Sequence, residues 1–330
     1  MIALDRRRST GALLFAVALT ALAGTLGSLG HLAWWLELFT HFRPQYALLL
    51  TAGGIGLMVL GRLGVGFAAL ALAAANALPM LSYYVAPPVQ AGGGPEIKVV
   101  LSNVYFRNGD HDRLLDYIGR LKPDVAVFLE VTPEWREALQ SLSGTLPYQA
   151  HAGEVFVAST RPLAGLDALP LPGTGEIAVA FSLDSDAGRV TIVGAHADWP
   201  LGAAIAANRN LELASLAEIA RALPGPVLLL ADLNVTAFSP VFNALLVRSG
   251  LADCAAGHGF HPTWPAWFPP LYMQIDHCLA GPGLVVTGFN TGPYVGSGHY
   301  PLEVTLRLQG VTSSDGHGVS ASLGPPTSRR

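Results

Sequence analysis

The segment Val227-Leu228-Leu229-Leu230-Ala231-Asp232-Leu233-Asn234 decides what kind of fold this chain adopts. It begins with a short apolar run, which is typical of a buried strand. Two polar residues, Asp232 and Asn234, follow where the strand ends. Burying a carboxylate is costly unless it is paired or binds a metal ion. The segment therefore predicts a sheet core with a polar site at its edge.

Other apolar runs in the chain end in, or are interrupted by, a polar residue in the same way. These residues are Asn103, Glu130, His196 and Asp276. One polar residue at the end of an apolar run is more often a solvated strand end. Several such residues in one chain are hard to explain in that way. If the strand ends converge, these side chains form one cluster.

Residues 96–308 alternate between strand-like and helix-like segments. Short apolar runs predict strands at 97–104, 124–131, 154–159, 176–183, 189–195, 227–231, 273–279, 284–289 and 302–308. Apolar spacing and N-terminal capping residues predict helices at 114–121, from 132, at 202–222 and at 239–249. Several predicted strands follow one another directly, which fits two mixed sheets packed face to face, with helices outside, better than one parallel sheet.

The charged residues are unevenly distributed along the chain. Only 13% of residues are charged and the mean hydropathy is +0.42, whereas an average soluble domain carries roughly 25% charged residues. Of the 19 basic and 23 acidic residues, five and two lie in residues 1–95. The first part of the chain is therefore expected in lipid and the second in water.

Three uncharged segments predict transmembrane helices at 11–30, 45–61 and 63–85, since a span takes about 20 apolar residues. The arginines at 6–8 and Arg62 favour the cytoplasmic side. We therefore expect a multi-pass protein of a plasma membrane, with residue 96 onward outside the cytoplasm. A cleaved signal peptide within residues 1–30 is the alternative, and it leaves this orientation unchanged.

These patterns divide the chain into four parts. A membrane region at 1–86 is followed by a Pro- and Gly-rich linker at 87–95, a domain at 96–308 and a disordered tail at 309–330. The two cysteines, Cys254 and Cys278, are too few for a disulfide scaffold. Pairing and burial as free thiols both stay open, and we favour unpaired cysteines.

The excess of acidic over basic residues in 96–330 limits the kinds of molecule that this part of the chain can bind. These residues carry the remaining 14 basic and 21 acidic side chains, so their net charge is −7. A protein that binds long nucleic acid without sequence preference usually has a basic surface, because phosphate neutralisation dominates that binding. Strong non-specific binding of nucleic acid is therefore disfavoured. Binding through a local basic patch stays an alternative.

Seven short motifs stand in the order found in the endonuclease/exonuclease/phosphatase superfamily. They are Ser102-Asn103-Val104, Phe128-Leu129-Glu130-Val131, Ala195-His196, Ala231-Asp232-Leu233-Asn234, Thr263-Trp264-Pro265, Ile275-Asp276-His277 and Ser297-Gly298-His299-Tyr300-Pro301. Residues 96–308 resemble this superfamily, and the N-terminal spans resemble its membrane-anchored bacterial branch. The resemblance implies a four-layer α/β sandwich, a bacterial inner membrane, and phosphoester hydrolysis with Mg²⁺, or alternatively Mn²⁺.

Hydrolysis of a phosphoester by water needs a base, a cation and donors to the developing charge. His299 is the predicted base, with Asp276 accepting a hydrogen bond from its other ring nitrogen. Glu130 and Asn103 are the predicted metal ligands, because carboxylate and amide oxygens suit Mg²⁺.

The remaining predicted site residues contact the phosphate or the substrate. His196 would donate to a phosphate oxygen, and Asp232 and Asn234 would position the attacking water or the phosphate. Arg209 is a weaker candidate for a substrate or structural contact, because it equally fits a solvated helix face. Thr263 is a weaker candidate that would border the pocket with Trp264, although Trp264 fits a packed position better.

One residue departs from the superfamily pattern. Gly298 stands where relatives usually have an aspartate that helps to bind metal. The chain is therefore expected to be a phosphodiesterase or phosphatase acting on a lipid head group or small molecule. A nuclease acting on DNA or RNA is one alternative, and a catalytically silent binding module is another. No protein partner can be inferred.

Overall fold

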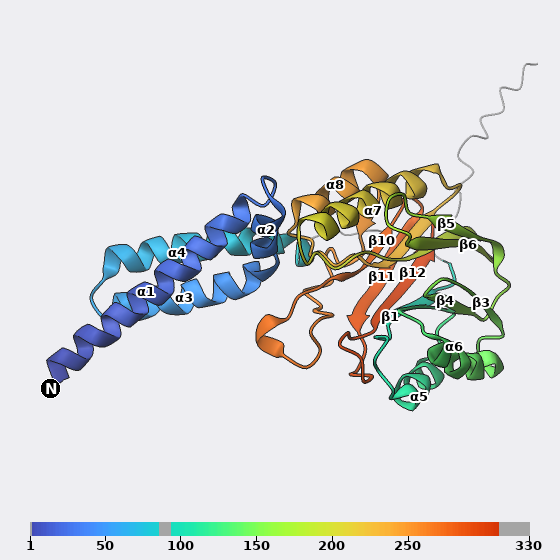
Figure 1. The fold of residues 1–330 in the computed structure, drawn as a ribbon, viewed down its shortest axis with the longest axis horizontal. Helices are drawn as coiled ribbons and strands as arrows, with labels where there is room; N and C mark the ends of the chain where they lie inside the picture. Colours follow the sequence, from blue (N-terminus) through green and yellow to red (C-terminus); the bar gives the residue numbers. More distant parts are fainter. Residues whose placement is uncertain (1, 86–93, 310–330) are drawn as a thin grey trace, which may run out of the picture.

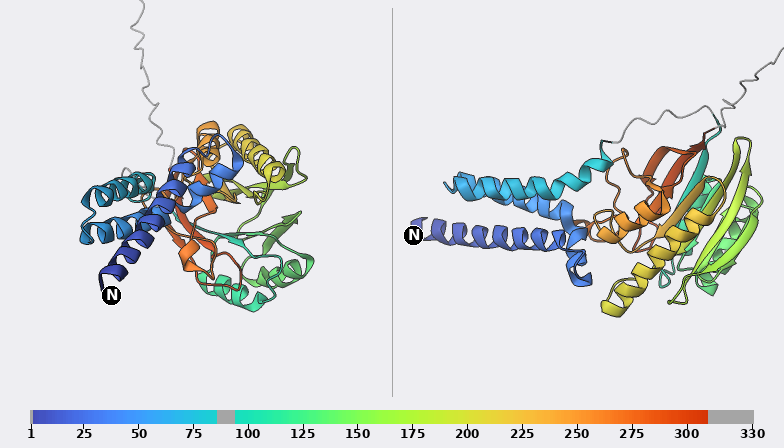
Figure 2. Two further views of the ribbon diagram at one scale, coloured as in Figure 1. Left: turned by 60° about the vertical axis from the view of Figure 1, so that its left-hand side comes forward. Right: turned by 90° about the horizontal axis from the view of Figure 1, so that it is seen from above.

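The computed structural model describes residues 2–85 and 94–309 of the chain. It shows a bundle of helices near the N-terminus and a two-sheet sandwich formed by the rest (Figure 1). The bundle projects from one end of the sandwich, as the right panel of Figure 2 shows. The predicted linker at 87–95 and tail at 309–330 fall almost entirely outside the described residues, so they stay predictions.

Three apolar helices form the N-terminal bundle. They are α1 (Ile2–Ser28), α3 (Arg43–Val59) and α4 (Leu63–Ala77), and the elements between and after them are α2 (Trp34–Glu37), η1 (Leu38–Phe42) and η2 (Leu78–Tyr83). Helices α3 and α4 approach closely at Gly54, where an added Cβ atom would lie 3.0 Å from the carbonyl oxygen of Gly66. Leu50 and Leu57 are fully buried in this bundle.

The bundle helices overlap the three predicted spans. Two helical stretches, Arg7–Ser28 and Leu63–Tyr83, are long and apolar enough to cross a membrane, whereas α3 has 17 residues. Length and composition alone also fit a signal sequence or a core helix. Insertion in a membrane therefore stays a prediction.

Two six-stranded sheets form the sandwich, with the orders β11-β12-β1-β2-β4-β3 and β5-β6-β7-β8-β10-β9. The strands are β1 (Ile97–Asn103), β2 (Val125–Leu129), β3 (Tyr148–Ala152), β4 (Val155–Ser159), β5 (Ala164–Pro170), β6 (Ile177–Ser185), β7 (Gly188–His196), β8 (Val227–Asp232), β9 (Ala252–Asp253), β10 (Asp276–Ala280), β11 (Leu284–Thr291) and β12 (Leu302–Leu308). Each sheet has a parallel pair at its centre, β1 with β2 and β7 with β8, and antiparallel pairs elsewhere. The predicted mixed sheets are therefore confirmed.

Helices cover the outer face of each sheet. Helices α5 (His111–Leu121) and α6 (Pro133–Gln140) pack on the first sheet, and α7 (Ala203–Ala222) and α8 (Pro240–Ser249) on the second. The hydroxyls of Thr132 and Ser239 accept hydrogen bonds from the first turns of α6 and α8, as capping residues do. The predicted four-layer sandwich is confirmed.

The main core lies between the two sheets. Val99, Leu101 and Val127 of the first sheet share one buried cluster with Ile192 and Leu230 of the second. At Gly194 the sheets are so close that an added Cβ atom would lie 2.8 Å from a methyl group of Val127. A substitution at this glycine would therefore push the sheets apart.

The sequence pattern missed three strands, all at sheet edges. Strands β3, β5 and β9 lie at an end of their sheets, and most of their residues are exposed or half-buried. An edge strand packs on one side only, so it does not need the continuous apolar run on which the prediction depended.

The prediction that the two cysteines are unpaired is wrong. Cys254 and Cys278 form a disulfide, and their Cα atoms are 5.4 Å apart. Strands β9 and β10 pair next to this position, and the backbone N–H of Cys254 donates to the carbonyl of Cys278. Pairing of strands that lie 24 residues apart in sequence creates this proximity, and spacing alone does not reveal it.

Candidate active site

Strand pairing brings the polar strand ends together at one edge of the sandwich. In the second sheet, Asp232 pairs with His196 of the parallel strand β7 and with Asp276 of the antiparallel strand β10. In the first sheet, Asn103 pairs with Leu129, the residue before Glu130. The predicted convergence of these strand ends is therefore present.

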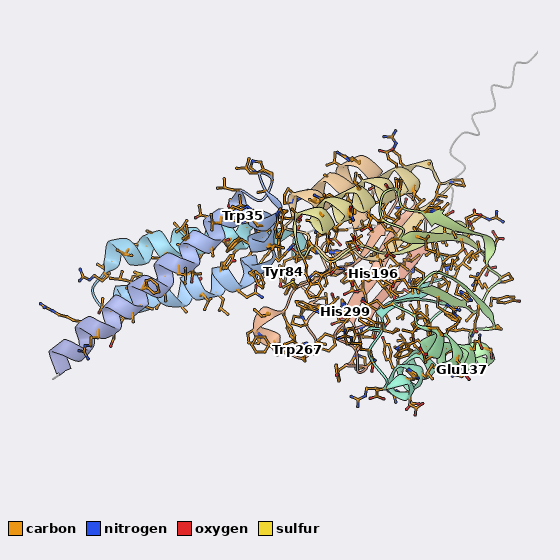
Figure 3. All side chains as sticks on the ribbon, in the orientation of Figure 1. Trp35, Tyr84, Glu137, His196, Trp267 and His299 are labelled. Carbon is orange, nitrogen blue, oxygen red and sulfur yellow. A yellow bond between two sulfur atoms is a disulfide. The ribbon has the colours of Figure 1, made fainter. Side chains whose placement is uncertain are left out.

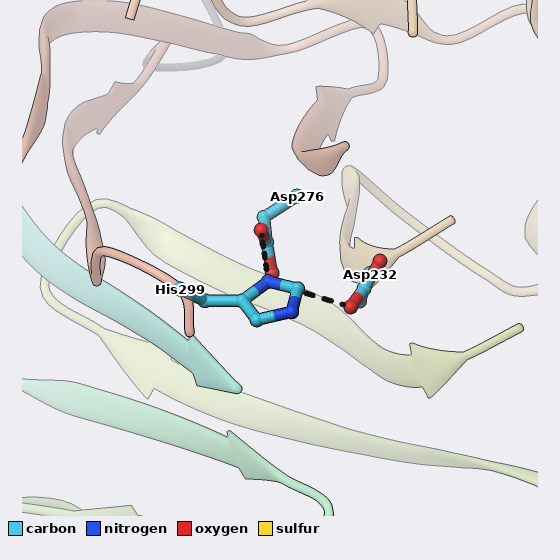
Figure 4. Close-up of side chains that lie close together, drawn as sticks. All are labelled: Asp232, Asp276 and His299. Atoms are coloured by element: carbon cyan, nitrogen blue, oxygen red, sulfur yellow. Dashed lines mark hydrogen bonds and ion pairs between the residues drawn. The ribbon is translucent and has the colours of Figure 1, made fainter. Parts of the chain in front are cut away.

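His299 lies against two buried carboxylates (Figure 4). Its Nδ1 is 2.8 Å from Oδ2 of Asp276 and 3.6 Å from Oδ2 of Asp232. The backbone at His299 is fixed by hydrogen bonds. The N–H of His299 donates to Ser297 Oγ, and this hydroxyl donates to the carbonyl of Asn103. The predicted hydrogen bond between His299 and Asp276 is present.

The buried acids change the pKa values of this cluster. Burial alone lowers the pKa of His299, but the charges of Asp276 and Asp232 outweigh it and raise the value to about 9. Burial and the charge of Asp276 raise the pKa of Asp232 to about 6. The negative charge of the acids therefore favours the protonated form of His299, and burial together with Asp276 disfavours ionisation of Asp232.

Glu130 faces the same cluster from the first sheet. Its backbone has φ +59°, an uncommon conformation for a residue that is not glycine. Its Oε1 accepts a hydrogen bond from Asn103 Nδ2 at 2.7 Å, and its Oε2 accepts one from the N–H of Phe106. This backbone turn directs the carboxylate of Glu130 into the cleft.

Asn103, a predicted metal ligand, presents its amide nitrogen to the acids, and its role as a ligand stays a prediction. Its Nδ2 donates to Asp232 Oδ2 at 2.9 Å as well as to Glu130. Its Oδ1 accepts from the N–H of Tyr105, so the amide oxygen is turned away from the acids. Asn103 therefore bridges the two carboxylates as a donor.

His196 has a partner that the sequence analysis missed. Its Nδ1 is 2.5 Å from Glu154 Oε1, and its Nε2 lies 3.7 Å from Glu130 and 3.8 Å from Asp232. Burial lowers the pKa of His196, but Glu154 and the neighbouring acids raise it to about 10. Glu154 lies directly before β4 and belongs to none of the seven motifs, so nothing in the sequence identified it as a site residue.

Asn234 lies in the cleft beside Asp232. Its backbone has φ +50°, and its N–H donates to Asp232 Oδ1 at 3.1 Å. Its side-chain Nδ2 donates to the carbonyl of Ala197, just after His196. The residue therefore connects the ends of β7 and β8.

Arg209 and Thr263 do not touch the cleft, so their predicted substrate contacts are corrected. Both side chains are fully buried. Arg209 Nη1 donates to the carbonyl of Asn234. Thr263 Oγ1 accepts from the N–H groups of Ile275 and Asp276. Both residues support site residues from behind.

The polar cluster opens into a cleft of about 1080 Å³. Glu130, His196, Asp232, Asn234 and His299 line it, together with Gly298. Asp276 stands behind His299 and has one carboxylate oxygen, Oδ1, with no hydrogen-bond partner among the described residues.

The donor set fits a hard divalent cation. The carboxylates of Glu130 and Asp232 face the same space, and ligand atoms of Asp232, Asp276 and His299 lie within 4.8 Å of one another. Oxygen-rich sites of this kind suit Mg²⁺ or Mn²⁺. A Cβ atom at position 298 would meet no clash, because the nearest atom to an added Cβ is Trp264 Nε1 at 3.8 Å.

Comparisons with known proteins identify the family and support the fold. The model of the "Endonuclease/Exonuclease/phosphatase family" matches residues 100–315. No curated protein matches the chain. A solved endonuclease/exonuclease/phosphatase from Beutenbergia cavernae is similar in fold, with 20% identity, a TM-score of 0.55, and coverage of 65% of this chain and 72% of that one.

Two further solved structures share the fold. Sphingomyelinase C from Streptomyces griseocarneus has 19% identity and a TM-score of 0.51, and the match covers 64% of this chain and 99% of that one. TDP2 from D. rerio, solved with a single-strand DNA product, has 14% identity and a TM-score of 0.54, with coverage of 65% and 100%. From the family match, this chain is a member of the endonuclease/exonuclease/phosphatase family.

Proposed function

We propose that this protein is a membrane-tethered, metal-dependent phosphoester hydrolase. The observation that carries the proposal is the contact of His299 with Asp276 and Asp232, in the same cleft as Glu130 and His196. This arrangement supplies a candidate base, candidate metal ligands and a hydrogen-bond donor around one space large enough for a phosphoester.

The reaction is attack of water on phosphorus, with cleavage of one P–O ester bond and departure of an alcohol. Neutral His299 takes the proton of the water, while Asp276 fixes the ring by its 2.8 Å contact with Nδ1. His196, whose pKa is about 10, donates from Nε2 to a phosphate oxygen. Asp232 and Asn234 position the water or the phosphate.

Glu130 and Asp232 would hold the Mg²⁺ ion, which when bound offsets the phosphate charge and supports formation of the nucleophile. Positive charge beside Asp232 would also lower the pKa of His299 from its value of about 9. That shift would leave His299 neutral, and able to accept a proton, at a lower pH.

The helical bundle supports a tether. Its apolar helices would span the inner membrane of a bacterium, with Arg62 in the cytoplasm and the sandwich outside it. The disulfide between Cys254 and Cys278 supports the same orientation, because disulfides persist in oxidising compartments.

A nuclease is the second candidate, because a solved neighbour of similar fold was determined with a DNA product. The cleft disfavours it. Among the described residues that line the cleft, Arg107 is the one lysine or arginine, against five acids, namely Glu130, Glu154, Glu176, Asp198 and Asp232. Long polyanions bind poorly to such a surface. A silent binding module is the outcome expected if Gly298 abolishes turnover.

The test uses the full-length protein in dodecyl maltoside. Bis(4-nitrophenyl) phosphate, 4-nitrophenyl phosphate and plasmid DNA are each offered with Mg²⁺, with Mn²⁺ and with chelator. We expect metal-dependent turnover of a small ester, and kcat lower by at least about 10²-fold in H299A and E130Q, the scale of losing general acid–base catalysis.

The matched controls are H151A and E137Q, since His151 and Glu137 are exposed and line no part of the cleft. Both should retain wild-type rates. Faster cleavage of plasmid DNA than of either small ester would favour the nuclease, and no turnover of any substrate would favour the silent module.

A further inference from the structure

Besides the polar cluster, the cleft has an apolar part. Its lining residues come from the N-terminal region and from the loop before β10. We propose that this part, formed by Leu38, Phe42, Trp267 and Met273, receives the hydrocarbon chain of a lipid phosphoester that enters directly from the membrane. The inference rests on the proposed function and narrows its substrate to a bilayer lipid.

One wall of this apolar part comes from the helical bundle itself. Leu38 and Phe42 belong to η1, which leads directly into α3, and both line the cleft. Leu38 follows Glu37, whose carboxylate is bound by Arg209 of the sandwich. The wall is therefore held in place beside the polar cluster while it is continuous with the proposed membrane helices.

The opposite wall comes from the loop that precedes β10. Trp267 and Met273 of this loop line the cleft. Gln45 of α3 donates from Nε2 to the carbonyl of Tyr272 at 2.8 Å. This hydrogen bond connects α3 to the loop, so the residues of the two walls are held beside the bundle.

The rim of the loop is apolar and exposed. Trp267 is 70% exposed, and Phe268 and Leu271 are exposed beside it. Figure 3 shows Trp267 on the side of the sandwich from which the bundle projects. Trp35 and Tyr84 lie on this side as well. Tryptophan and tyrosine favour the boundary between lipid and water. With the bundle in a bilayer, the loop would lie at that boundary.

The polar part of the cleft fits the head of such a lipid better than it fits a polymer. A single phosphate needs one cation site and few donors, which His196 and the pair Glu130 and Asp232 would supply. A chain of phosphates would need many basic side chains, and Arg107 is the one lysine or arginine among the described lining residues.

The test compares two phosphodiesters with the same leaving group, ethyl 4-nitrophenyl phosphate and hexadecyl 4-nitrophenyl phosphate. The full-length protein is assayed with Mg²⁺ in dodecyl maltoside, which contains no phosphoester. W267S and F42Q should lower kcat/KM for the hexadecyl ester by about 10-fold or more, the scale of losing one large apolar contact. Their rates on the ethyl ester should stay within about twofold.

The matched control is Y148S, because Tyr148 is an exposed aromatic residue on the edge strand β3 and lines no part of the cleft. It should leave both esters unchanged. Equal losses on both esters, or no loss on the hexadecyl ester, would overturn the apolar site while the hydrolase proposal stands. No turnover by the wild type of either ester, or of the two small esters of the first test, would overturn the hydrolase proposal.

A binding measurement decides the inference without turnover. The H299A protein is irradiated with a hexadecyl phosphate that carries a diazirine at the end of its chain, and the labelled peptides are identified by mass spectrometry. Labelling of residues 38–42 or 264–273 is expected. Labelling confined to the outer faces of α1 and α4 would show that the chain stays in the surrounding detergent, and would sink the inference.

Discussion

Glu37 of the N-terminal region forms a buried ion pair with Arg209 of α7, with 2.5 Å between Oε2 and Nη2. The two residues lie 172 positions apart in sequence, and neither side chain is more than 2% exposed. The same carboxylate accepts a hydrogen bond from Ser239 at the start of α8. Because Arg209 also donates to the carbonyl of Asn234, the helical bundle is connected to the segment that follows β8.

The first prediction concerns this ion pair. R209M leaves Glu37 buried without its charge partner, which should lower the free energy of unfolding by about 3–5 kcal/mol. The double variant E37L/R209M removes both charges and should recover most of that loss. Denaturation of the full-length protein in dodecyl maltoside, followed by tryptophan fluorescence, measures both. E37L alone completes the comparison, and if the loss in the double variant equals the sum of the losses in R209M and E37L, the two residues are not coupled.

The second prediction concerns Thr263, which supports Asp276 from behind. T263V removes the acceptor of two backbone N–H groups, and an unsatisfied buried group costs about 1–3 kcal/mol. We expect lower stability and a lower kcat, because Asp276 shifts, with little change in KM. T263S keeps the hydroxyl and should behave like the wild type. A change confined to KM would instead indicate the direct substrate contact that the sequence suggested.

The third prediction concerns Gly298, which lines the cleft and has room for a side chain. G298D adds a carboxylate beside the cluster, and ligand charge controls the affinity of such sites. The Mg²⁺ concentration that gives half-maximal activity should fall by about tenfold, since groups around a metal alter its affinity by about 10–100-fold. G298N has nearly the same size without the charge. Equal Mg²⁺ requirements for both variants would contradict an electrostatic effect.

The fourth prediction concerns His41, which is buried against Thr236 with Nδ1 3.1 Å from its hydroxyl. Burial, assisted by the charge of Arg209, lowers the pKa of His41 to about 3. The unfolded chain binds this proton near pH 6.5, so the contribution of neutral His41 is present above that pH and is lost as the pH falls from about 6.5 to about 3.

The expected slope for one such group is at most about 1.4 kcal/mol per pH unit. H41N retains an acceptor and does not titrate, so the fall in stability between pH 6.5 and pH 4.5 should be smaller in this variant. Denaturation curves at a series of pH values make the comparison. Parallel curves for the wild type and H41N would mean that His41 titrates normally in the folded protein.

The fifth prediction concerns the disulfide between Cys254 and Cys278. Closing a loop of this size contributes about 2–4 kcal/mol, so C254S/C278S should unfold at a lower temperature than the oxidised wild type. Reducing agent should lower the unfolding temperature of the wild type and leave the variant unchanged. Alkylation of thiols in intact cells also tests on which side of the membrane the sandwich lies. If Cys254 and Cys278 react before any reducing agent is added, the sandwich is in the cytoplasm, because disulfides persist in oxidising compartments.

The strands of the sandwich could be predicted from the sequence because each carries its own signal. A continuous apolar run such as 227–231 must be buried wherever it lies, and a carboxylate directly after it must find a partner or a cation. The polar strand ends and the order of the motifs therefore predicted both the four-layer fold and the cluster around Asp232. The edge strands β3, β5 and β9 carry no such signal, because only one side of each is paired and their residues are exposed or half-buried.

Contacts between distant segments were decided only by the tertiary structure. Glu154 beside His196, Glu37 beside Arg209 and the cleft wall at Phe42 each join positions that no local pattern relates. Local sequence specifies what a side chain needs, such as burial or a partner of opposite charge. Which residue meets that need depends on how the two sheets and the bundle pack, since packing alone sets the distances over which charges and hydrogen bonds act.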